Sequence, residues 1–157
     1  MNAQEPKNEI DALGWQLARQ MYGHNYAPSF GVIKIASAQS LEDVQQEIKK
    51  QYEKSKPGDA SYEITDSNAM LKQVQNCFDY RGDQGAGLEL TSEQETSLKE
   101  TQQDFVSKIC DFVSDSSIIY STSIEEGLPI YYTFWHFAFV ILNPEGESLF
   151  LFGAASD

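Results

Sequence analysis

Apolar residues recur at spacings of three and four in four segments of the chain, which is the period of an amphipathic helix. These segments predict helices over residues 6–22, from Ser40 to the turn at 57–59, from a cap at Asp66 or Ser67 to about Tyr80, and from a cap at Thr91 or Ser92 to about Val113. In the second segment, Asp43 follows Ser40 at the spacing of a capping-box variant, which marks a helix start.

Shorter runs rich in β-branched and aromatic residues predict strands. They cover residues 30–37, 62–64, 117–123, 130–142 and 148–154. A Pro- and Gly-containing connection at 143–147 is typical of an antiparallel hairpin. The run over 130–142 carries apolar residues on both of its faces, so we expect a central strand that is covered on both sides.

The order of these elements predicts the fold class. Helices come mostly first and strands last, which favours an α+β fold. We expect about four helices packed on a mainly antiparallel sheet that ends in a C-terminal strand meander. A length of 157 residues is sufficient for one ordinary hydrophobic core, and we expect a single globular domain over 1–157.

The charge of the chain restricts its possible partners. The chain has 24 acidic and 11 basic residues and a net charge of −13, and the imbalance begins after Lys56. Residues 1–56 have seven acidic and seven basic side chains, whereas residues 109–157 have seven acidic side chains and no Lys or Arg. This sign is wrong for contacts with phosphate, so nucleic acid is not an expected partner.

The sequence also argues against a membrane partner and against secretion. Its longest apolar run, residues 134–142, is far shorter than the roughly 20 residues of a spanning helix. The N-terminal residues lack the basic and apolar regions of a secretory signal. Two cysteines are too few for a disulfide scaffold, so the expected location is cytoplasmic.

Candidate catalytic and metal-binding residues are few. Cys77 and Cys110 fall late in their predicted helices and beside acidic residues, where a thiolate is disfavoured, so both are expected to be small buried hydrophobic residues rather than nucleophiles. His136 lies in the apolar strand and His24 in a loop, and neither has a second ligand at a metal-like spacing. We therefore expect no cofactor, no metal and no catalytic residue.

The sequence of a small acidic domain without catalytic machinery favours one interpretation of its function. It is that of a non-catalytic protein that binds a basic partner protein, such as an inhibitor or an immunity-type protein. A concentrated negative surface accelerates encounter with a positive one. The predicted contacts are Asp115, Glu125 and Glu126, around the connection before the long strand. Tyr80 and Asp83, at the glycine-rich loop 81–87, are the second choice.

Two alternatives stay open. One is a small enzyme that uses His24 or His136 with carboxylates, which predicts a pocket holding a histidine, an acid and a polar donor. The other is a structural subunit that pairs through its C-terminal strands, because residues 148–154 lack the lysines that commonly protect an exposed strand edge. The second alternative also allows a homodimer.

Overall fold

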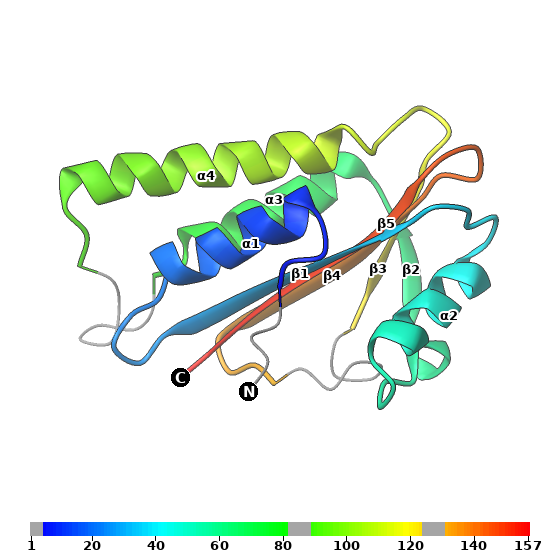
Figure 1. The fold of residues 1–157 in the computed structure, drawn as a ribbon, viewed down its shortest axis with the longest axis horizontal. Coiled ribbons are helices and arrows are strands. Elements are labelled where there is room, and N and C mark those ends of the chain that lie inside the picture. Colours follow the sequence, from blue (N-terminus) through cyan, green and yellow to red (C-terminus); the bar gives the residue numbers. More distant parts are fainter. Residues whose placement is uncertain (1–4, 82–88, 124–130) are drawn as a thin grey trace.

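Five strands form one antiparallel sheet in the computed structural model, which describes residues 5–81, 89–123 and 131–157 (Figure 1). They are β1 (Ala27–Ile35), β2 (Tyr62–Thr65), β3 (Ile118–Thr122), β4 (Trp135–Leu142) and β5 (Ser148–Ser156). The strand order is β1-β5-β4-β3-β2. Strands β3 to β5 therefore form the predicted C-terminal meander, β2 is added antiparallel to β3, and β1 is added antiparallel to β5.

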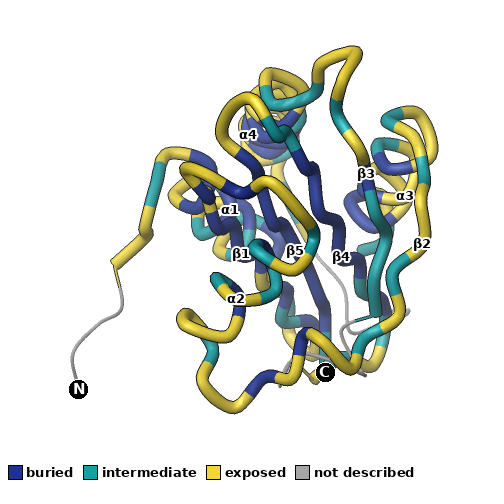
Figure 2. The backbone as a smooth tube through the Cα atoms, turned by 90° about the vertical axis from the view of Figure 1, so that its right-hand side faces the viewer, coloured by how far each residue is buried: buried dark blue, intermediate teal, exposed yellow. Residues whose placement is uncertain are grey.

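Four α-helices cover the two faces of this sheet and confirm the α+β class. They are α1 (Glu9–Gln20), α2 (Leu41–Gln51), α3 (Ser67–Asp79) and α4 (Ser92–Cys110), with a short 3₁₀ helix, η1 (Pro57–Asp59), after α2. Figure 1 shows α1, α3 and α4 on one face and α2 on the other. The sheet is the most buried part of the chain because it lies between these layers (Figure 2).

Successive side chains of β4 point to opposite faces of the sheet and so pack in two hydrophobic clusters, as the sequence predicted for a central strand. Trp135, Phe137 and Phe139 pack in the cluster under α1, α3 and α4. Ala138 and Val140 pack in the cluster under α2. Both clusters are sequestered from water, so β4 has no solvated face over most of its length.

Local signals placed the helix starts well. Ser40 and Asp43 form the predicted capping box of α2, and the Asp66 side chain accepts a hydrogen bond from the backbone N–H of Ala69 at the start of α3. The first helix begins later than predicted. Its N-cap is Asn8, whose side chain accepts from a backbone N–H of the first turn, so the segment from residue 6 is not helical.

The predicted strand over 130–142 is too long. Residue 130 lies outside the described ranges, and residues 131–134 precede β4 without joining it. The backbone N–H groups of Thr133 and Phe134 both donate to the carbonyl of Ala155, at 3.0 and 3.1 Å. Two successive N–H groups cannot meet one carbonyl in a regular ladder, so strand geometry begins only at Trp135.

The edge strands are β1 and β2, and this corrects the prediction of a free edge at residues 148–154. Strand β5 pairs with β1 on one side and with β4 on the other. The outer edge of β1 is partly closed by α1. Asp11 accepts a hydrogen bond from the backbone N–H of Val32 at 3.1 Å, and the Asn8 amide donates to the Val32 carbonyl at 3.0 Å.

Candidate functional site

The end of α4 and the β4–β5 turn lie at the same end of the molecule (Figure 1), and both contribute carboxylates to one cavity there. Asn143 joins the two segments, because its side-chain amide donates to the carbonyl of Phe112 at 2.6 Å and its Oδ1 accepts from the Ser117 hydroxyl. An open cavity of about 610 Å³ lies between them, and Asp111, Glu145 and Glu147 line it. We call these three residues, with the adjacent exposed Asp115, the acidic end.

No residue of the acidic end takes part in any ion pair among the described residues. Asp111 is also the C-cap of α4, where the unsatisfied carbonyls of a helix add partial negative charge. One base approaches this region, since the Lys34 ammonium lies 5.5 Å from the ring centroid of Phe112. The acidic end therefore presents exposed carboxylates that no base neutralises by direct pairing.

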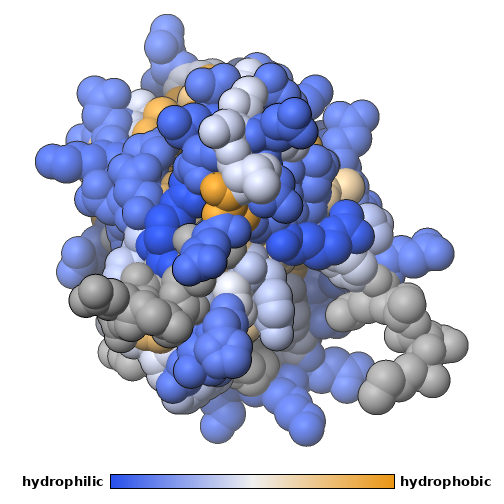
Figure 3. Space-filling model, turned by 90° about the vertical axis from the view of Figure 1, so that its left-hand side faces the viewer, coloured by the Kyte–Doolittle hydropathy of each residue, from blue (hydrophilic) through white to orange (hydrophobic). Residues whose placement is uncertain are grey.

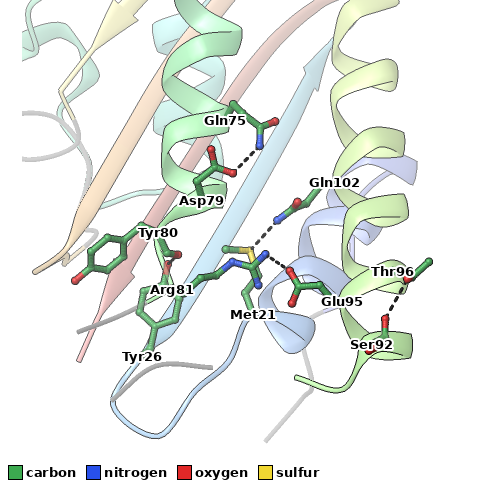
Figure 4. Close-up of polar contacts among 10 residues, drawn as sticks. All are labelled: Met21, Tyr26, Gln75, Asp79, Tyr80, Arg81, Ser92, Glu95, Thr96 and Gln102. Atoms are coloured by element: carbon green, nitrogen blue, oxygen red, sulfur yellow. Dashed lines mark hydrogen bonds and ion pairs between the residues drawn. The ribbon is translucent and has the colours of Figure 1, made fainter. Parts of the chain in front are cut away.

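Tyr80 lies elsewhere, at the C-cap of α3, and is half-buried (Figure 4). Its ring centroid is 5.8 Å from that of Tyr26 and 5.5 Å from that of Phe134. Its carbonyl accepts a hydrogen bond from the Tyr26 hydroxyl at 3.0 Å, and that hydroxyl accepts from the indole N–H of Trp135 at 2.6 Å. Tyr80 thus contributes to a packed polar and aromatic junction between α3, β1 and β4.

Two of the predicted contacts, Asp115 and Tyr80, are described by the structure, and they lie far apart. Asp115 is exposed and follows the C-terminal end of α4. Tyr80 lies towards the other end, because its neighbour Arg81 pairs with Glu95 at 2.8 Å. A helix rises about 1.5 Å per residue, so roughly 24 Å of α4 separates Glu95 from Asp111. The remaining predicted contacts, Asp83, Glu125 and Glu126, lie outside the described residues.

A second cavity of about 430 Å³ lies between α3 and α4, and we call it the α3–α4 groove. Four of its lining side chains carry charge or a buried amide: Asp79 and Arg81 from the α3 side, and Lys99 and Gln102 from α4. The Asp79 carboxylate accepts from Gln75 at 2.9 Å. Figure 4 shows Gln102 projecting from α4 towards α3.

Sequence reasoning did not assign the α3–α4 groove. One signal was present, because Gln102 interrupts the apolar stripe of the fourth predicted helix between Leu98 and Phe105. The structure confirms that this position faces inward, since Gln102 is only 7% exposed. A polar residue on a buried helical stripe is therefore the feature that could have located the groove.

The histidines do not build a catalytic pocket of the predicted kind among the described cavities. His24 is exposed in the turn between α1 and β1. His136 is half-buried on β4, and its ring centroid lies 4.1 Å from that of Tyr132. Neither histidine lines the acidic end or the α3–α4 groove. In the described ranges, no group of three His, Cys, Asp or Glu residues is arranged to hold a metal ion.

The two thiols have different surroundings. Cys77 is a buried residue of α3, and burial raises the pKa of its thiol to about 11. A thiol with such a pKa is almost fully protonated near neutral pH and is a poor nucleophile. Cys110 is exposed at the last position of α4, so the prediction that both cysteines are buried is wrong for Cys110.

The end of the molecule opposite the acidic end is mainly hydrophilic in its described part (Figure 3). Small apolar areas are visible near the centre and at the upper left of that view, and polar side chains surround them. None of the described helices combines the length and the hydrophobicity that crossing a bilayer would require.

The fold and these two cavities define an α+β protein with a C-terminal meander of three strands, one further strand added at each of its edges, and helices on both faces. No protein-family model matches the chain, and no significant match was found among curated proteins or solved structures.

Proposed function

We propose that the chain is a non-catalytic binding protein that recognises a basic partner protein through its acidic end. The observation that carries this proposal is the convergence of Asp111, Glu145 and Glu147 on one open cavity, with Asp115 beside it. These carboxylates come from two segments far apart in the sequence, so the fold concentrates charge that the sequence alone leaves dispersed. An inhibitor or an immunity-type protein would use such a surface to occupy a site on its partner that is built for anions.

Electrostatic reasoning supports this use of the surface. Exposed carboxylates that no base pairs with create a negative potential, and the C-terminal end of α4 adds to it. A potential of this kind accelerates encounter with a basic surface, and its effect weakens as salt shortens the Debye length.

Selection from a random peptide display library on the immobilised protein tests the proposal without a known partner. We expect the selected peptides to be enriched in Lys and Arg and to bind more tightly at low salt. Simultaneous replacement of the acidic end by Asn and Gln removes four negative charges and is expected to weaken binding by tenfold or more. The substitutions are Asp111→Asn, Asp115→Asn, Glu145→Gln and Glu147→Gln.

A control variant separates location from bulk charge. Glu63→Gln, Glu89→Gln, Glu100→Gln and Asp104→Asn remove the same number of charges from exposed positions outside the acidic end. The control is expected to change affinity by less than about threefold, which is less than 1 kcal/mol. Equal weakening in both variants, or selected peptides without basic enrichment, would contradict the proposal.

A further inference from the structure

The α3–α4 groove contains an amide side chain whose hydrogen-bonding capacity is largely unused. Gln102 is 7% exposed, and its Nε2 has a single partner among the described residues, the sulfur of Met21 at 4.0 Å. A thioether is a weak acceptor, and its Oε1 accepts no hydrogen bond from a described residue. The buried side-chain atoms that lack a partner in the described residues are Gln20 Oε1 and Thr122 Oγ1, so the Gln102 oxygen is open to solvent and the amide is accessible to a molecule in the groove.

Opposite charges flank this amide without neutralising each other. Asp79 and Lys99 both line the α3–α4 groove, yet they form no ion pair with each other or with any other described residue. In contrast, Arg81 in the same groove is already paired with Glu95 at 2.8 Å. The groove is therefore lined by one carboxylate and one ammonium group that form no ion pair with described residues, together with the Gln102 amide.

The presence of bases in the groove is unusual for this chain. Residues 57–157 contain four bases, Lys72, Arg81, Lys99 and Lys108, against seventeen acidic residues. Two of these four bases line the α3–α4 groove. The groove is thus a locally balanced, polar site within the acidic part of the chain.

We propose that the α3–α4 groove binds a small zwitterion of the α-amino-acid type. The ligand's carboxylate accepts hydrogen bonds from the Lys99 ammonium and the Gln102 amide N–H, and its ammonium group donates to the Asp79 carboxylate. A cavity of about 430 Å³ is large enough for such a molecule. The partly buried Val106 on the same wall offers contact for an apolar part of the ligand's side chain.

Titration of the ¹⁵N-labelled protein with each standard L-amino acid tests this proposal by NMR. The two charges of the ligand are tested separately with single-charge analogues, the N-acetyl amino acid and the amino acid amide. We expect saturable shifts of the Gln102 side-chain amide and of backbone resonances in 75–81 and 95–107 for at least one free amino acid. Both analogues are expected to bind at least tenfold more weakly.

Variants in the groove and matched controls outside it complete the test. Lys99→Met and Asp79→Asn are each expected to weaken binding by tenfold or more. Lys72→Met on α3 and Glu100→Gln on α4 make the same charge changes at exposed positions that do not line the groove, and are expected to change affinity by less than twofold.

Three results would overturn the proposal. The first is the absence of saturable shifts in the groove at about 10 mM amino acid, which is tenfold above a weak Kd of about 1 mM. The second is equal binding of a free amino acid and its single-charge analogues. The third is an equal loss of affinity in the groove variants and in their controls, since that would report bulk charge.

Discussion

Asp11 provides the sharpest test of how the β1 edge is held, because one buried carboxylate connects α1 to that edge. Asp11 is only 6% exposed and accepts two backbone hydrogen bonds. One comes from the N–H of Val32 at 3.1 Å, and the other comes from the N–H of Lys7 at 3.0 Å. Asp11→Ala removes both acceptors and leaves the Val32 N–H buried without a partner.

The expected loss of stability follows from these contacts. A hydrogen bond to a charged acceptor contributes about 1.5–3 kcal/mol, and an unsatisfied buried donor costs about 1–3 kcal/mol. Alanine recovers roughly 0.6 kcal/mol because its helix propensity exceeds that of aspartate. We therefore expect Asp11→Ala to lower the free energy of unfolding by about 2.5 kcal/mol, which corresponds to a Tm decrease of roughly 5–10 °C for a chain of this length.

Urea unfolding measures the loss in the free energy of unfolding, and hydrogen exchange measures the loss of protection at individual amides. Asp104→Ala, at an exposed position of α4, is the matched control for the loss of charge and the gain in helix propensity. The amide of Val32 is expected to exchange faster in Asp11→Ala than in the control. If the two variants unfold within about 0.5 kcal/mol of each other, the Asp11 bonds do not hold the edge and the reasoning fails.

Three further predictions concern buried groups. Gln102→Leu replaces an amide that has few hydrogen bonds with an apolar side chain. We therefore expect the free energy of unfolding in urea to rise by about 1 kcal/mol and amino-acid binding to be lost, whereas a loss of stability would show that the amide is well satisfied. Native alkylation near neutral pH, followed by mass spectrometry, is expected to modify Cys110 and spare Cys77, whose thiol pKa is raised by burial to about 11; comparable modification of both thiols would contradict this. Burial raises the pKa values of Tyr26 and Tyr52 to about 12, above the unfolded value of 10.0, so their contribution to stability is complete below pH 10 and is lost as pH rises to about 12. Each tyrosine is expected to lower the free energy of unfolding by up to about 1.4 kcal/mol per pH unit in that range, and Tyr→Phe at either position should reduce this slope.

Local sequence signals predicted most of the secondary structure because their physics acts over a few residues. The capping box at Ser40 and the N-cap at Asp66 satisfy backbone donors within one helical turn, so spacing alone reveals them. Apolar residues on both faces of β4 correctly indicated a central strand, because the side chains of a strand alternate between the two faces of its sheet.

The position of β5 could not be predicted in this way. Its edges depend on whether β1, more than a hundred residues earlier, returns to pair with it. Nothing in residues 148–154 themselves encodes that pairing, so the missing lysines suggested an exposed edge. Their absence instead suits an interior strand, because β5 is paired on both sides and buried between the two clusters.

The candidate sites were partly predictable for the same reason. Asp115 was assigned from local charge, and the structure places it at the acidic end. The convergence of Asp111 with Glu145 and Glu147 on one cavity depends on Asn143, which connects the β4–β5 turn to the end of α4. Such tertiary contacts decide which acidic residues share a surface, and the sequence pattern carries no information about them.

The two proposed sites lie on the same helix but are expected to act independently. From Lys99 to Asp111, α4 rises about 18 Å, roughly twice the Debye length of about 8 Å at physiological salt. A zwitterion in the α3–α4 groove also brings no net charge. Its binding therefore should not alter the affinity of the acidic end for a basic peptide through electrostatics. If saturation with an amino acid did change that affinity, the coupling would have to pass through the packing of α4 on the sheet, and the Gln102→Leu variant would be expected to abolish it.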